Sequence, residues 1–115
     1  MPWVRNVHSG GVKIPKAVQE RTRLRILEHA ALSCATRWQI EVRFRGALCY
    51  VDAVEGPASD RLHLVRLRYF GNDERWSVAF YTYSHEQYEP TFFPSGDDQG
   101  TPEQAFDIGA VYLVD

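Results

Sequence analysis

The pattern of apolar and polar positions gives its strongest hairpin signal in residues 62–83, where two apolar-rich runs flank the turn-forming residues 71–74. Valine, leucine and aromatic side chains favour a half-buried pleated surface, and a Gly/Asn/Asp cluster between two such runs is typical of a β-hairpin. The turn predicts four opposed pairs on the core side: Tyr69 with Trp76, Leu67 with Val78, Val65 with Phe80, and His63 with Thr82.

The opposite side of this hairpin is polar, basic and aromatic. Alternate side chains of a strand point to opposite faces of a sheet, so the residues between the core positions share the second face. They are Leu62, Leu64, Arg66, Arg68, Phe70, Arg75, Ser77, Ala79, Tyr81 and Tyr83.

A second hairpin is predicted over residues 37–54. Apolar and charged residues alternate in residues 37–45, as in a half-buried strand, whereas residues 47–54 are largely apolar on both sides, as in an interior strand. A two-residue loop at Arg45-Gly46 places Tyr50 and Asp52 on the arginine-bearing side, whereas a three-residue loop places both on the opposite side. The two-residue loop pairs Val42 with Cys49 and Ile40 with Val51.

Two helices are predicted beside the strands. Apolar residues recur at three- and four-residue intervals after Pro15 and predict an amphipathic helix of about 20 residues. Its expected buried residues are Ala17, Leu24, Leu27, Ala31 and Cys34, and its expected solvent side carries Lys16, Glu20, Arg21, Arg23, Arg25 and Glu28. Thr101-Pro102-Glu103-Gln104 has the form of a helix N-cap and predicts a closing helix. That helix has Ala105, Phe106, Ile108, Gly109, Tyr112 and Leu113 available for burial.

These elements predict one α+β domain over residues 13–115, preceded by a loose N-terminal arm at residues 1–12. The expected sheet is a four-stranded antiparallel meander, with the N-terminal and C-terminal helices packed on one face. Residues 84–90 predict a helical turn that ends at Pro90, and residues 91–93 predict a short edge strand. The core expected beneath the helices consists of Trp38, Ile40, Val42, Phe44, Val65, Leu67, Trp76, Val78 and Phe80.

Charge is distributed unevenly along the 115 residues. The net charge is −2, but all 13 Lys and Arg residues lie within residues 1–83. Residues 84–115 contain Asp and Glu but no Lys or Arg. Most of the cations are arginine, whose planar guanidinium suits bidentate pairing with carboxylate or phosphate. Either an anionic ligand or the acidic tail of the chain itself is a suitable partner for them.

Several classes of protein are disfavoured by composition. Cys34 and Cys49 are too few for a disulfide scaffold and are predicted to be reduced, buried thiols. Residues 1–11 lack the apolar core of a signal peptide, and no stretch approaches the roughly 20 apolar residues of a membrane-spanning helix. A cytoplasmic protein without a membrane partner is therefore expected.

The first candidate site is the arginine-bearing side of the predicted sheet. Its members are Arg37, Arg43, Arg45, Arg66, Arg68 and Arg75, with Gln39, Glu41, Tyr81 and Tyr83 among them. Arginine interleaved with aromatic rings suits single-stranded nucleic acid or a phosphorylated ligand, through phosphate pairing and base stacking. The slightly acidic overall charge is unlike that of a dedicated nucleic-acid domain. The alternatives are internal ion pairs with Glu41, Asp52 and the acidic tail, or a protein partner.

The second candidate is a carboxylate site of Glu41 and Asp52, with Glu20 or Glu28 from the first helix. Metal-dependent nucleases of the restriction-endonuclease type use such acids to hold Mg²⁺, together with a nearby lysine. Here the acid-x-cation pair precedes Asp52, which reverses the order in that family, and the chain has lysine only at positions 13 and 16.

The third candidate is residues 85–89 (His-Glu-Gln-Tyr-Glu), which offer one histidine and two carboxylates to a metal. A zinc-peptidase helix requires a second histidine one turn later and no interruption. Glu89 occupies that position and Pro90 ends the turn. No metal site and no catalytic residue is therefore predicted, and His63 is expected to be a hydrogen-bonded structural histidine.

Six segments of the chain resemble a small bacterial family of uncharacterised proteins: RGALCYVDA (45–53), LRYFG (67–71), RWSVAFYTYS (75–84), YEP (88–90), FPSG (93–96) and GTPE (100–103). The resemblance extends over roughly residues 13–114. It implies a bacterial, cytoplasmic, single-domain protein, and it transfers neither an activity nor a functional residue.

The sequence therefore favours a non-enzymatic binding or interaction protein without a cofactor. The expected site is the Arg/Tyr-rich sheet face, and the expected partner is anionic, either a nucleic acid or an acidic protein surface. The alternative is a metal-dependent hydrolase or nuclease that uses Glu41 and Asp52.

Overall fold

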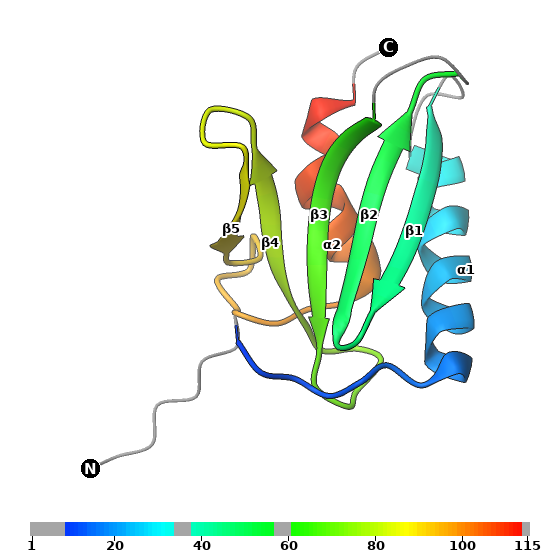
Figure 1. Cartoon of the computed structure of the whole chain (residues 1–115), viewed down its shortest axis with the longest axis vertical. Coiled ribbons are helices and arrows are strands. Elements are labelled where there is room, and N and C mark those ends of the chain that lie inside the picture. Colours follow the sequence, from blue (N-terminus) through cyan, green and yellow to red (C-terminus); the bar gives the residue numbers. More distant parts are fainter. Residues whose placement is uncertain (1–8, 34–37, 57–60, 114–115) are drawn as a thin grey trace.

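Five antiparallel strands form a single sheet in the order β1-β2-β3-β4-β5, and two helices cover one of its faces (Figure 1). The computed structural model describes residues 9–33, 38–56 and 61–113. Its elements are α1 (Lys16–Ser33), β1 (Gln39–Arg45), β2 (Leu48–Val54), β3 (Arg61–Tyr69), β4 (Trp76–Thr82), β5 (Gln87–Thr91), α2 (Pro102–Gly109) and the 3₁₀ turn η1 (Ala110–Tyr112). The α+β class, the antiparallel meander and both helices are confirmed, but the sheet has five strands instead of four.

The additional strand, β5, occupies a segment for which a helical turn was predicted. Residues 83–86 form the loop after β4, with Glu86 in the left-handed region at φ 52°, and β5 then pairs with β4. Pro90 is placed opposite Ala79 on this edge strand. Proline has no N–H to donate to a further strand, so it is tolerated at an edge and blocks additional pairing there.

The hairpin of β3 and β4 has the predicted register, with Tyr69 opposite Trp76 and Val65 opposite Phe80. The register of the β1–β2 hairpin is shifted by two residues from the predicted one, so that Val42 lies opposite Val51 and not opposite Cys49. Arg45 lies opposite Leu48, because the two-residue loop is formed by Gly46 and Ala47. Gly46 adopts a φ of 59°, which a residue without a side chain reaches at little energetic cost.

A β-bulge in β3 changes which side chains face the core. Val51 pairs with Val65 but Asp52 pairs with His63, so Leu64 is an extra residue in β3. Leu64 is fully buried, and His63 faces Asp52. The predicted placement of His63 on the core side and of Leu64 on the polar side is therefore wrong, because strict alternation was assumed through the bulge.

The core lies between the helices and one face of the sheet. Of the predicted core residues, Val42, Val65, Leu67, Trp76 and Val78 are buried, and Trp38, Ile40, Phe44 and Phe80 pack partly buried against them. Cys49 is a free, fully buried cysteine, and burial raises the pKa of its thiol. Cys34 and Arg37 lie outside the described residues.

Helix α1 buries a different stripe from the predicted one. Its buried residues are Val18, Thr22, Ile26 and Ala30, spaced at four-residue intervals, whereas the predicted Ala17, Leu24, Leu27 and Ala31 are exposed. Apolar residues occur on two sides of this helix, so periodicity alone favours neither side. The backbone N–H of Ile14 donates to the Gly46 carbonyl at 2.9 Å, which fixes the chain just before the helix.

Helix α2 begins with the predicted cap. The Thr101 hydroxyl accepts from the Gln104 N–H, and the Gln104 side chain accepts from the Thr101 N–H, which satisfies two donors at the helix start. Ala105, Phe106 and Gly109 are buried beneath it. Among the described residues, neither helix is long and apolar enough to cross a membrane.

Candidate functional site

The face of the sheet turned away from the helices, called the outer face below, carries most of the predicted site residues. Strand pairing sets Arg43 beside Tyr50, Tyr50 beside Arg66, and Leu48 beside Arg68. With them lie Glu41, Asp52, Arg61, His63, Ser77, Tyr81, Tyr83 and Tyr88, joined by the contacts described next.

Asp52 is the centre of one cluster on this face, and its side chain is completely buried. One carboxylate oxygen lies 3.1 Å from Nη2 of Arg43, and the other lies 3.0 Å from Nδ1 of His63. A guanidinium nitrogen of Arg61 lies 3.8 Å away, and Arg61 also pairs with Glu41 at 2.6 Å. A buried carboxylate requires such partners, because its desolvation is otherwise strongly unfavourable.

The carboxylates of the second candidate site do not form a metal-binding group. Glu41 and Asp52 are neighbours, but both face Arg61. Glu20 and Glu28 are exposed on α1, on the other side of the sheet. Within residues 9–33, 38–56 and 61–113, no three His, Cys, Asp or Glu side chains are grouped so that they could hold a metal ion. At the third candidate site, His85 Nδ1 lies 2.8 Å from a Glu89 oxygen, an exposed pair at the β4–β5 loop.

Five aromatic rings form a second group on the outer face: Tyr50, His63, Tyr81, Tyr83 and Tyr88. The ring centroid of Tyr81 lies 4.8–5.1 Å from those of its three neighbours in this group, and that of Tyr88 lies 5.8 Å from Tyr50. The guanidinium of Arg43 lies over Tyr50 at 5.1 Å, and that of Arg66 lies over Tyr88 at 5.2 Å. The rings and guanidinium groups therefore form one continuous surface.

Two tyrosine hydroxyls in this group differ in their surroundings. The Tyr83 hydroxyl accepts from the His63 N–H at 2.8 Å and donates to the His63 carbonyl at 3.2 Å, so it holds the backbone of β3 at this residue. The Tyr88 hydroxyl is buried and has no hydrogen-bond partner among the described residues. Burial and the nearby Asp52 raise the pKa of Tyr88, so its hydroxyl stays protonated.

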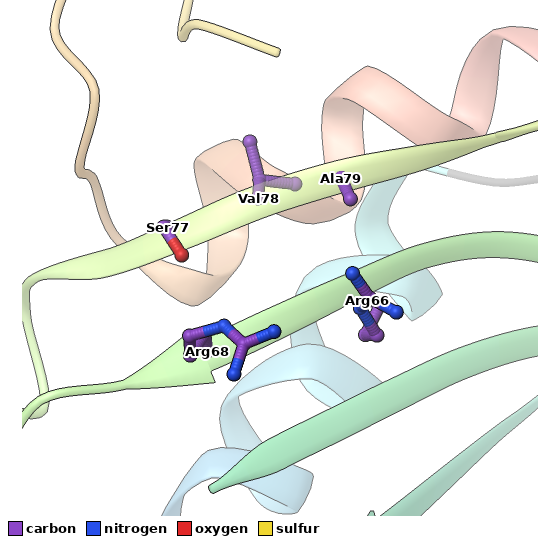
Figure 2. Close-up of a pocket in the computed structure, with 5 residues that line it drawn as sticks. All are labelled: Arg66, Arg68, Ser77, Val78 and Ala79. Atoms are coloured by element: carbon purple, nitrogen blue, oxygen red, sulfur yellow. The ribbon is translucent and has the colours of Figure 1, made fainter. Parts of the chain in front are cut away.

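Arg66 and Arg68 project from neighbouring outer positions of β3 (Figure 2). With Ser77, Val78 and Ala79 they line a small pocket that is open to solvent. Nη1 of Arg68 donates to the Gly10 carbonyl at 2.9 Å. Burial and the positive charge of Arg66 lower the pKa of Arg68. In the described part of the chain, no carboxylate lies within ion-pair distance of either guanidinium.

The described part of the acidic tail pairs mainly with the helical side of the molecule. Glu103 of α2 lies 2.7 Å from Arg25 of α1, and Asp107 lies 2.7 Å from His29. Arg25 also pairs with Glu74 in the β3–β4 loop at 2.6 Å. The charged stripe of α1, predicted to face solvent, is thus partly engaged in ion pairs. The predicted pairing of sheet arginines with internal acids holds for Arg43, through Asp52.

The remaining predicted site residues are less closely connected. Arg45 is exposed at the end of β1, and Arg75 donates to the side chain of the buried Gln99 at 3.2 Å. The sequence did not single out Tyr88 or Arg61 for this face, and it assigned His63 to the core. Recognising them required the strand β5 and the bulge, neither of which has a local signal in the sequence.

No protein-family model matches the chain, and no similar curated protein or solved structure is found. This outcome is consistent with the resemblance to a family of unknown function. The function is therefore argued from the geometry of the outer face.

Proposed function

We propose that this protein binds a single-stranded nucleic acid on the outer face of its sheet, with backbone phosphates held by Arg66 and Arg68. The observation that carries the proposal is the pair of adjacent guanidinium groups that lacks a carboxylate partner in the described residues. Each of the cations Arg21, Arg25, Arg43 and Arg61, by contrast, faces at least one carboxylate. Bound phosphates relieve the repulsion between Arg66 and Arg68 and accept charge-assisted hydrogen bonds from them.

The spacing of the two arginines supports a polymeric ligand. Side chains two residues apart on a strand leave the same face roughly 6–7 Å from each other. Successive phosphates of an extended single strand are separated by a similar distance. A strand that follows β3 therefore presents one phosphate to Arg68 and the next to Arg66.

The tyrosines beside the arginines support a nucleic acid over other polyanions. Tyr81 and Tyr83 stack edge to face at 4.8 Å, and Tyr83 is 43% exposed. Exposed tyrosine rings next to a basic track provide stacking platforms for unpaired bases. An acidic protein surface also pairs with arginine, but it gains nothing specific from such rings.

The alternative of a metal-dependent hydrolase has weaker support. Arg61 faces both Glu41 and Asp52, so a metal ion would have to displace this guanidinium. Bacterial origin and a cytoplasmic location are further predictions that rest on the resemblance of the sequence.

The test is fluorescence anisotropy with labelled single-stranded RNA and DNA over a series of salt concentrations. We expect binding that weakens as salt rises, and we expect Arg66→Ala and Arg68→Ala each to reduce the slope of log affinity against log salt by about 0.7. The matched control is Arg21→Ala, because Arg21 lies on α1 and pairs with Asp73 at 2.9 Å. Binding that is insensitive to salt, or equal in all three variants, contradicts the proposal. Tighter binding to polyglutamate than to nucleic acid assigns the face to an acidic protein instead.

A further inference from the structure

His63 and Asp52 form a pair that the binding proposal does not use. Nδ1 of His63 lies 3.0 Å from a carboxylate oxygen of Asp52. Because an ionised carboxylate only accepts hydrogen bonds, we assign the proton of a neutral imidazole to Nδ1. Nε2 is then left as a proton acceptor. A carboxylate that orients an imidazole in this way is the arrangement by which proteins make histidine a general base.

The His63–Asp52 pair has a more deeply buried carboxylate than the His29–Asp107 pair. Asp52 is 0% exposed and the His63 side chain is 35% exposed, so a fixed carboxylate supports a ring that solvent and ligands reach. In the His29–Asp107 pair, by contrast, the carboxylate is 58% exposed. Arg43 holds the second oxygen of Asp52, which further restricts the position of the carboxylate.

The pair lies next to the proposed phosphate site. The imidazole of His63 and the guanidinium of Arg66 both flank the ring of Tyr88, with separations of 6.2 and 5.2 Å from its centroid. Because a single side chain separates the two groups, a phosphodiester bound to Arg66 places its adjoining ribose beside His63. The bulge in β3 produces this arrangement, since without the extra Leu64 the imidazole would point into the core.

We infer that the outer face cleaves single-stranded RNA, with His63 as the general base; this inference rests on the proposed binding function. Nε2 of His63 takes the proton of the ribose 2′-hydroxyl, and the 2′-oxygen forms a bond to phosphorus. The bond between phosphorus and the 5′-oxygen breaks, and the departing oxygen takes a proton from water. The proton on His63 then neutralises the resulting hydroxide. The products are a 2′,3′-cyclic phosphate and a 5′-hydroxyl, and Arg66 balances the negative charge that develops on the phosphoryl oxygens.

Asp52 is a positioning residue in this scheme. It acts through the imidazole and does not contact the RNA. Its replacement should therefore lower the turnover rate more than the affinity for RNA.

The experiment measures binding and cleavage on the same end-labelled RNA, by anisotropy and by denaturing gel with mass spectrometry of the products. We expect His63→Gln to retain RNA binding and to lose about 10²–10⁴-fold in cleavage rate. His29→Gln is the matched control, because His29 contacts Asp107 on the helical side, and it should cleave as the unmodified protein does. Purification of all variants in parallel identifies contaminating ribonuclease, which would cleave equally in every preparation.

RNA that carries a single 2′-deoxyribose should resist cleavage at that position while binding normally. RNA that is bound but not cut, or cut equally by His63→Gln, overturns the catalytic inference and leaves the binding proposal intact. Cleavage that requires Mg²⁺ and leaves a 5′-phosphate also overturns it, in favour of the metal-dependent alternative. Absence of RNA binding overturns the inference, and absence of binding to single-stranded DNA as well removes the proposed function itself.

Discussion

Arg25 of α1 donates two hydrogen bonds to Glu103 of α2, from Nη2 to one oxygen at 2.7 Å and from Nε to the other at 2.8 Å. The same guanidinium donates to both oxygens of Glu74 at 2.6 and 2.9 Å. A single arginine thus connects the two helices and the loop between β3 and β4. The hydrogen bonds that Arg25 donates to both carboxylates raise its pKa, and the interaction with Glu103 contributes most.

The first prediction is that Arg25→Ala lowers the free energy of unfolding by about 1–2 kcal/mol, because it leaves two carboxylates without their cation. Chemical denaturation measures the change. Arg21→Ala is the control, since Arg21 is 58% exposed and pairs with a single acid, and it should change the free energy of unfolding much less than Arg25→Ala does. Equal effects of the two variants would show that the link between the helices does not contribute to the free energy of unfolding.

The second prediction concerns the acid stability of the same link. Burial acts to raise the pKa of Glu103, but the hydrogen bonds and positive charge of Arg25, a backbone hydrogen bond and the nearby His29 together outweigh it and hold the pKa below the ordinary value of 4.5. A lowered pKa means that this stabilisation is complete above pH 4.5 and is lost as pH falls through the lowered value. Glu103→Gln should therefore have a lower Tm than the unmodified protein at neutral pH. Its Tm should approach that of the unmodified protein as the pH falls below 4.5. A Tm difference that does not change with pH contradicts the assignment.

The third prediction compares two leucines that the bulge and the helix orientation distinguish. Leu64 is 0% exposed and Leu24 is 58% exposed. Leu64→Ala should lower the free energy of unfolding by about 2–5 kcal/mol, because it removes buried contacts and leaves a cavity. Leu24→Ala should change it by less than about 0.5 kcal/mol. Denaturant titration of both variants decides the matter, and a larger effect at Leu24 would place the other stripe of α1 in the core.

These two leucines also mark where sequence reasoning fails. The register of β3 and β4 was predictable because the turn at residues 71–74 is local and the strands alternate without interruption from Val65 to Tyr69 and from Trp76 to Phe80. The bulge at Leu64 was not, since it arises where β3 must pair with β2 and β4 at once. The buried stripe of α1 was not predictable either, because apolar residues lie on two sides of that helix and tertiary packing selects one.

The candidate site was predictable in the same partial way. Arg43, Arg66 and Arg68 follow from simple alternation along regular strands, and the structure sets Arg43 on β1 and the other two on β3, with β2 between them. His63 and Tyr88 depend on long-range events, the bulge and the pairing of β5 with β4. Charge counting identified the acidic tail as a partner for arginine. It did not identify Arg25, whose pairing with Glu103 depends on how the two helices pack.

The last prediction separates the two roles of Tyr83. Its hydroxyl makes two hydrogen bonds to the backbone of His63, and the residue is 43% exposed on the proposed binding face. Tyr83→Phe should lower the free energy of unfolding by about 1–2 kcal/mol while leaving the affinity for single-stranded RNA nearly unchanged, because the ring is retained. Tyr83→Leu removes both and should also weaken RNA binding, by about 1–3 kcal/mol. Denaturant titration and anisotropy on the three proteins measure the two effects separately. If Phe and Leu reduce RNA affinity equally, the hydroxyl and not the ring is what the nucleic acid requires, and Tyr83 does not stack on a base.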